Sequence, residues 1–314
     1  MKRSKFILYL LTSIFLLAGV AACGQATTMP TPTSTSVPTP MAIIPAATLQ
    51  AVDEQRTLTV AGLERTYQLH IPNGLASGQP APFVLVFHGL EENGAFISQS
   101  SGFNEIADAN GFIVAYPNGS GPTSAMSWNA GDCCGYAQQN SLDEASFVRQ
   151  IISDVETITP LDPKRIYVSG FSNGALLSYR LACEMSDTIA AVAPVAGVLV
   201  YSPCQPSQPV AVIAFNGLSD TSVPYEGGGM NPTTGQPFPP VQDTITTWAT
   251  LDGCVETPQV EQDGILTHTS YSTCQNGTAV ELYTIQGIGH SWPTPYVVPA
   301  SQMIWDFFAA HPKQ

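Results

Sequence analysis

Basic residues are scarce in this chain. Ten lysines and arginines stand against 24 aspartates and glutamates in 314 residues, which gives a formal net charge of −14. Three of the ten, Lys2, Arg3 and Lys5, lie at the very start, so the remainder carries seven against 24, or −17. Binding to nucleic-acid phosphates needs clustered lysine and arginine. Nucleic acid is therefore excluded as an expected partner.

Metal-binding patterns are also missing. The sequence contains no C-x-x-C, and its five histidines do not cluster. Structural zinc sites are built from such closely spaced cysteines and histidines. We therefore expect no metal site.

A long apolar run occupies residues 6–22, directly after the basic start. This pattern, ending in small residues, predicts an export signal over residues 1–23. The ending Val20-Ala21-Ala22-Cys23-Gly24 resembles a bacterial lipoprotein signal, which implies a lipid on Cys23. The alternative is an ordinary signal peptide cut nearby, with an incidental cysteine. An uncleaved anchor is disfavoured because about 17 apolar residues are at the lower limit for spanning a bilayer.

Residues 24–56 differ sharply in composition from the C-terminal part of the chain. Threonine, serine and proline dominate, and no charge occurs before Asp53. Such a segment cannot bury enough apolar area to offset its ordering entropy, so we expect a disordered tether. Residues 57–314 contain no repeat and no second linker, and their length suits one large domain.

Six cysteines follow Cys23. In an exported chain an even number favours disulfides. Closeness in sequence predicts the pairs Cys254–Cys274 and Cys183–Cys204, which leaves the adjacent Cys133 and Cys134 to each other. A ring between neighbours is strained, so the alternative is that each of these two reaches a different partner.

Short apolar runs alternate with helical patterns along the domain. This alternation is typical of an α/β fold with a mostly parallel central sheet and helices on both faces. Residues 141–144, Ser-Leu-Asp-Glu, predict a capping box ahead of one helix, and residues 175–184 predict another. The expected strands are 83–87, 112–116, 165–169, 189–195, 210–215 and 280–285.

The pentapeptide Gly170-Phe171-Ser172-Asn173-Gly174 lies between a predicted strand and a predicted helix. This is the context of a nucleophile elbow, in which a serine is held on a sharp turn and flanking glycines relieve crowding. The alternative, a glycine-rich turn before a helix, becomes less favoured in this context. We therefore expect Ser172 to be a nucleophile.

A serine nucleophile needs an imidazole base and a carboxylate that orients it. His290 follows the last predicted strand in a glycine-rich loop, and Asp220 follows another strand after a short turn. Both lie where groups gather at the carboxyl edge of a parallel sheet, in the chain order Ser, Asp, His. The alternative for Asp220 is a solvated turn residue. Other acids, Asp252 among them, are expected on helix or strand surfaces.

The oxyanion of a tetrahedral intermediate needs backbone N–H donors. One is expected from Asn173, next to the nucleophile, and the other from Leu90 or its neighbours after the first core strand. His88 is then interpreted as a structural residue that shapes this loop.

With these residues identified, the chain resembles secreted esterases of the polyhydroxybutyrate depolymerase and feruloyl esterase type, a branch of the α/β-hydrolases. The segments that carry the likeness are VFHGL, SWNAGDCCG with LDEASF, VSGFSNGALLSYRLAC with IAAVAPVAG, NGLSDTSVPYEGG and GIGHSWP. The resemblance implies ester hydrolysis by Ser172, Asp220 and His290 through an acyl-enzyme, without a metal or organic cofactor.

Two departures from that family concern the site. Residues 90–92, Leu-Glu-Glu, stand where relatives commonly carry small residues or cysteine, and LDEA replaces a pair of aspartates. Trp128 and Trp292 are expected either to stack on a feruloyl or sugar ring, or to be buried supports of their loops.

The function expected from the sequence is that of a secreted or cell-surface serine esterase, monomeric, which contacts membrane only through its N-terminal lipid. Its substrate would be a polyester or an esterified plant polysaccharide, with acetylxylan or general short-chain esters as the alternative. Two other interpretations stay open: a non-catalytic surface binding lipoprotein, and a peptidase on the same fold.

Overall fold

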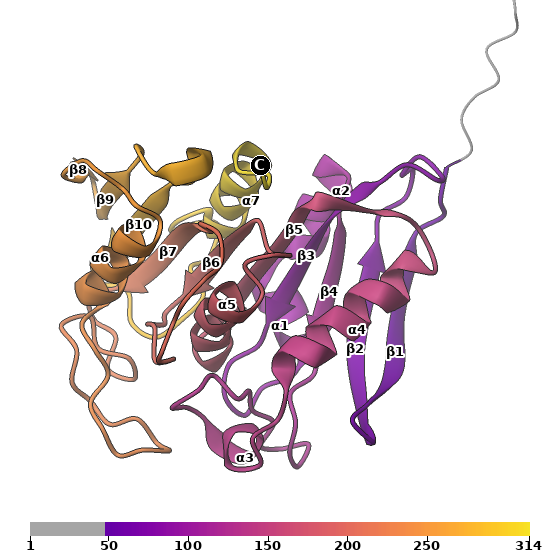
Figure 1. The fold of residues 1–314 in the computed structure, drawn as a ribbon, viewed down its shortest axis with the longest axis horizontal. Helices are drawn as coiled ribbons and strands as arrows, with labels where there is room; N and C mark the ends of the chain where they lie inside the picture. The colour runs from indigo at the N-terminus through magenta and orange to yellow at the C-terminus, as the bar shows by residue number, and fades with distance from the viewer. Residues whose placement is uncertain (1–47) are drawn as a thin grey trace, which may run out of the picture. The chain divides into compact units, whose positions relative to one another are not determined.

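The computed structural model describes residues 48–314, which form one ten-stranded sheet covered by helices (Figure 1). The predicted signal peptide, Cys23 and most of the predicted tether lie outside these residues. The strand order is β1-β2-β4-β3-β5-β6-β7-β10-β9-β8. The strands are β1 Val52–Val60, β2 Leu63–Ile71, β3 Ala81–Phe87, β4 Ile113–Pro117, β5 Leu161–Phe171, β6 Ala191–Val195, β7 Ala211–Gly217, β8 Gln259–Asp263, β9 Leu266–Tyr271 and β10 Val280–Ile285.

The centre of the sheet is parallel. Strands β4, β3, β5, β6, β7 and β10 pair side by side in the same direction, whereas β1 and β2 at one edge and β9 and β8 at the other pair antiparallel. Strands β3, β4, β6 and β7 are buried along their whole length, as expected for parallel strands covered on both faces. The predicted α/β fold is confirmed.

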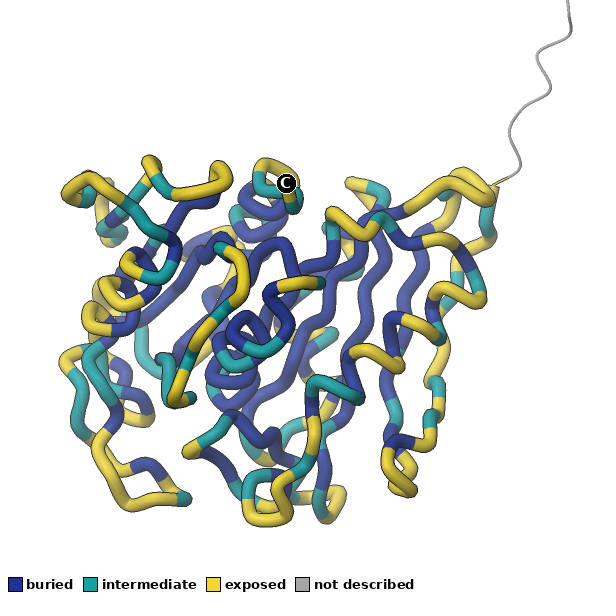
Figure 2. Tube along the Cα trace, viewed as in Figure 1, coloured by how far each residue is buried: buried dark blue, intermediate teal, exposed yellow. Residues whose placement is uncertain are grey.

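Helices cover both faces of the sheet. Apolar side chains of α4, α5 and α6 pack in one core cluster, and those of α1, α2 and α7 pack in a second cluster on the opposite face. Figure 2 shows the buried strands running between these two layers. The helices are α1 Gly94–Ser101, α2 Phe103–Asn110, α3 Gly135–Gln139, α4 Glu144–Glu156, α5 Asn173–Glu184, α6 Val241–Leu251 and α7 Ala300–Ala310, with a 3₁₀ turn at Gln275–Gly277.

Two predicted boundaries differ from the structure. The first strand begins at Val52, inside the predicted tether, and Leu49 already donates its N–H to Leu75 O. The capping box is also displaced. The N-cap of α4 is Asp143, whose carboxylate accepts the Ser146 N–H, while Glu144 turns inward instead of closing a box with Ser141.

Three disulfides join the pairs that closeness in sequence predicts: Cys133–Cys134, Cys183–Cys204 and Cys254–Cys274. None of the helices in the described part of the chain has the length and apolarity needed to cross a membrane.

Candidate active site

Ser172 lies on the turn between β5 and α5 in a backbone conformation that side chains rarely adopt, with φ of 53° and ψ of −117°. The flanking glycines make this turn possible. A Cβ on Gly170 would press against the Gly174 backbone, and a Cβ on Gly174 would lie 2.7 Å from His88 O. The strand, the helix and the loop after β3 therefore approach each other more closely than any larger residue allows.

The structure brings Asp220 and His290 to this serine. His290 Nε2 lies 2.8 Å from Ser172 Oγ, and His290 Nδ1 lies 2.7 Å from Asp220 Oδ2. The other oxygen of Asp220 accepts the N–H groups of Ser222 and Val223, at 2.8 and 2.9 Å. These bonds fix a buried carboxylate, which in turn favours a proton on Nδ1. Nε2 is then free to accept the serine proton.

A cavity of about 110 Å³ opens beside Ser172. Leu90 and Asn173 both line it, and within residues 48–314 neither of their N–H groups has an acceptor. Free backbone donors beside a candidate nucleophile are what an oxyanion hole requires. The rest of the lining is mainly apolar: Cys133, Cys134, Leu176, Ser222, Val223, Pro232 and Phe238.

Trp128 is fully buried and ties the two donor segments together. Its indole N–H donates to His88 O at 3.0 Å. Its backbone N–H donates to Asn173 Oδ1 at 2.7 Å, and its backbone oxygen accepts from Asn173 Nδ2 at 3.1 Å. The expected stacking of Trp128 on a substrate ring is therefore wrong, because no face of the ring is open. The residue is a buried support.

Trp292 is also buried, with 7% of its surface exposed. Its indole N–H donates to Ser301 Oγ at 3.1 Å, and its ring packs edge-on against Phe103. These contacts lie in the core between α2 and α7, so the expected substrate contact of Trp292 is wrong for the same reason.

His88 shapes the loop after β3, as the sequence indicates. Its Nε2 accepts the Gly119 N–H at 2.9 Å, so its Nδ1 carries the proton and donates to Gly89 O at 2.7 Å. Burial lowers the pKa of His88 to about 4. A neutral imidazole with both nitrogens engaged has no remaining capacity to act as a base.

A buried ion pair that sequence reasoning missed supports the same region. Arg65 Nη2 lies 3.0 Å from Glu144 Oε2, and Glu144 Oε1 accepts the Asn129 N–H at 3.2 Å. Burial raises the pKa of Glu144, and the nearby Arg65 opposes that shift. The only signal in the sequence was that LDEA replaces a pair of aspartates of the family. The side chain of Glu144 is one methylene longer than that of an aspartate.

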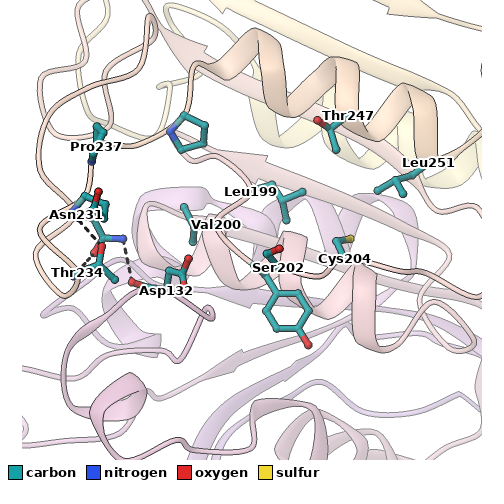
Figure 3. A pocket seen from close by; sticks show the side chains of 13 residues that line it. Asp132, Leu199, Val200, Ser202, Cys204, Asn231, Thr234, Pro237, Thr247 and Leu251 are labelled. Atoms are coloured by element: carbon teal, nitrogen blue, oxygen red, sulfur yellow. Dashed lines mark hydrogen bonds between the residues drawn. The ribbon is translucent and has the colours of Figure 1, made fainter.

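A second, larger cavity has a volume of about 380 Å³ (Figure 3). Two chain segments, near residues 132–134 and 231–238, line both this cavity and the cavity at Ser172. Thr247 and Leu251 of α6 form another wall, and Asn231 Nδ2 donates to Asp132 O at 3.0 Å. In the part of the chain that the structure describes, no group of three or more His, Cys, Asp or Glu side chains could hold a metal ion.

Comparison with known proteins gives esterases as relatives of this chain. The family model "Esterase PHB depolymerase" matches residues 65–220, which include Ser172 and Asp220. Putative esterase NocK of Nocardia uniformis subsp. tsuyamanensis is 30% identical over 311 residues, 90% of this chain and 88% of that protein. The chain belongs to the PHB depolymerase esterase family, a family of carboxylic ester hydrolases. His290 lies beyond the residues that the family model matches.

Feruloyl esterase B of Piromyces equi is 31% identical to the chain over 243 residues, 75% of this chain but 43% of that larger protein. Among solved structures, acetyl xylan esterase from Aspergillus awamori has a TM-score of 0.60 at 17% identity, covering 82% of this chain and 99% of that one. This structural likeness supports the α/β-hydrolase fold.

Proposed function

We propose that the chain is an exported serine esterase in which Ser172 attacks the ester carbonyl, His290 moves the proton and Asp220 orients the imidazole. The observation that carries this proposal is the continuous hydrogen-bonded row from Asp220 through His290 to Ser172. His290 takes the serine proton and gives it to the leaving alcohol as the acyl-enzyme forms. It then activates the water that releases the acid.

The Leu90 and Asn173 N–H groups are the proposed oxyanion donors. Both residues line the cavity that adjoins Ser172, and neither N–H has another acceptor among the described residues. Backbone donors that are already fixed in place need no reorganisation when negative charge develops on the carbonyl oxygen. Residues 90–92 differ from the family pattern, but the segment still supplies the Leu90 N–H, because a backbone donor does not depend on the side chain.

The size of the cavity at Ser172 favours a short acyl group. About 110 Å³ is well below the roughly 300 Å³ at the lower end of pockets for drug-sized ligands. An acetyl or hydroxybutyryl group suits this apolar space better than a feruloyl group. We therefore assign short-chain esters as the preferred substrates.

One observation favours a polyester as the source of that acyl group. Several exposed large apolar side chains lie on connections that leave the carboxyl ends of β3, β4, β7 and β10, the edge of the sheet that carries Ser172. Apolar side chains exposed on the connections at that edge suit contact with an apolar polymer. They are Phe96, Tyr136, Leu218, Met230, Tyr296 and Val297.

Export is part of the proposal. Three disulfides suit an oxidising compartment, in agreement with the predicted signal. Lipidation of Cys23 would hold the enzyme at the cell surface. Mass spectrometry of the protein from a membrane fraction tests this point, since an unmodified mature N-terminus would contradict it.

The experiment for the substrate compares four esters with the purified protein and its Ser172→Ala variant: nitrophenyl butyrate, methyl ferulate, acetylated xylan and emulsified polyhydroxybutyrate. We expect turnover of the butyrate and clearing of the polyester, with methyl ferulate turned over at least tenfold more slowly. Preference for ferulate would refute the short-acyl assignment. Absence of turnover on every ester would favour a binding lipoprotein.

A further inference from the structure

The turn after β3 is closed twice by one residue, Glu92. The Glu92 N–H donates to Gly89 O at 3.3 Å, and the Glu92 carboxylate oxygen Oε2 accepts the Gly89 N–H at 2.8 Å. Leu90 and Glu91 are thus the central residues of a four-residue turn, with Glu91 at φ 65°. Leu90 lines the cavity at Ser172, and its N–H has no acceptor among the described residues.

Glu92 is partly buried, and its carboxylate packs close to the site. A Cβ on Gly89 would lie 3.0 Å from Glu92 Oε2 and 3.1 Å from Phe171 Cδ1, which shows how tightly the three residues pack. Phe171 directly precedes Ser172, and its ring centroid lies 5.0 Å from that of His290. Burial raises the pKa of Glu92, and the bond from the Gly89 N–H and the nearby His290 oppose that shift.

The turn is also tied to the rest of the chain, because the Glu91 N–H donates to Met126 O at 2.8 Å. The two bonds made by Glu92 close the turn on itself. Glu91 has a positive φ, which costs a side-chain-bearing residue roughly 1 kcal/mol. A second bond across the turn offsets that cost and keeps one conformation. The position of the Leu90 N–H depends on that conformation, and so does any bond it makes to a developing oxyanion.

We propose that Glu92 is a positioning residue for ester hydrolysis, and that its carboxylate, by accepting the Gly89 N–H, holds the Leu90 N–H where the oxyanion forms. The inference rests on the proposed function. Glu92 touches neither the substrate nor the reacting atoms, and the role needs an acceptor oxygen at this place rather than a negative charge. Glutamine supplies such an oxygen and alanine does not.

The test compares Glu92→Gln and Glu92→Ala with Glu91→Gln, a matched control in which the neighbouring exposed side chain loses its charge. Steady-state kinetics on nitrophenyl butyrate and thermal unfolding are measured for each. We expect Glu92→Ala to lower kcat about tenfold to a hundredfold, less than or equal to the loss on removing an oxyanion donor. Its KM should change less than about threefold. Glu92→Gln should keep at least a third of wild-type kcat, as should Glu91→Gln.

The proposal is overturned if Glu92→Ala keeps wild-type kcat, if its loss falls on KM alone, or if Glu92→Gln is as impaired as Glu92→Ala while melting at the wild-type temperature. Should Glu92→Ala fail to fold, Glu92→Gln still decides: activity within about threefold of wild type supports the acceptor role, and a larger loss overturns it. Wild type and Ser172→Ala, assayed in parallel, separate the two claims. Equal turnover by those two proteins would refute the proposed function itself, whatever the Glu92 variants do.

Discussion

Asn173 and Trp128 hold each other by two hydrogen bonds, one in each direction. Asn173 Oδ1 accepts the Trp128 backbone N–H, and Asn173 Nδ2 donates to the Trp128 backbone oxygen. Through its indole N–H, Trp128 also holds His88 O, next to the turn that carries Leu90. The two proposed oxyanion donors come from distant parts of the chain, and one buried tryptophan joins the segments that carry them.

Replacing Trp128 with phenylalanine removes the indole N–H and leaves His88 O without that donor. We expect kcat on nitrophenyl butyrate to fall about tenfold with little change in KM, because the loss affects donor placement more than substrate binding. Trp292→Phe is the matched control, since the same atoms are removed from a core position whose N–H donates to Ser301. Equal kcat in the two variants would argue against a special role for Trp128.

The Arg65–Glu144 pair should be important for stability. The two side chains are only 5% and 1% exposed, so Glu144→Gln leaves a buried guanidinium without its counter-charge. Removing one partner of such a pair typically costs about 3–5 kcal/mol, and the glutamine amide offsets part of this because its single oxygen still accepts from either Arg65 or Asn129. We therefore expect the free energy of unfolding, measured by urea titration, to fall by about 2–4 kcal/mol.

Asp143→Asn is the control for that measurement. Asparagine also caps helices well, and Asp143 is largely solvated, so the change should be within about 0.5 kcal/mol. A Glu144→Gln protein as stable as Asp143→Asn would show that the ion pair contributes little.

Asp252 predicts a pH dependence of stability. Its sequence context indicates a surface position, but it is fully buried at the end of α6, where its Oδ1 accepts the Val210 N–H at 3.0 Å. Burial raises its pKa to about 7, against about 3.9 for an unfolded chain. The folded state therefore binds this proton more tightly than the unfolded state. Its contribution is fully present below about pH 4 and is lost as the pH rises to 7.

Urea titrations between about pH 4.5 and 7.5 check this. The Asp252 contribution to the free energy of unfolding should fall with rising pH by at most about 1.4 kcal/mol per unit, and Asp252→Asn should remove that component. Asp243→Asn, at an exposed position of the same helix, should leave the wild-type slope unchanged. An identical slope in wild type and Asp252→Asn would refute the assignment.

The sequence predicted the fold and singled out Ser172, Asp220 and His290, because each lies in the connection that follows a strand of the parallel part of the sheet. The positions of the predicted strands and the chain order Ser, Asp, His are the patterns that allowed this prediction. The supports of the site were not predictable in this way. Arg65 meets Glu144 across 79 residues of sequence, and Glu92 bonds back to Gly89 only in one turn conformation. Both depend on how loops pack, which no local pattern records.

The two tryptophans illustrate the same limit. An aromatic residue near a candidate site serves equally well as a substrate platform or as a core side chain, and burial alone distinguishes these roles. Trp128 and Trp292 are buried, with indole N–H groups bonded inside the protein.

The most direct test of the central claim is to trap the acyl-enzyme. The protein is mixed with excess nitrophenyl butyrate, quenched in acid within the first turnovers, and examined by intact mass and peptide mapping. We predict one butyryl adduct on the peptide that contains Ser172, and none in Ser172→Ala. An adduct on another residue, or undiminished hydrolysis by Ser172→Ala, would contradict the proposed mechanism.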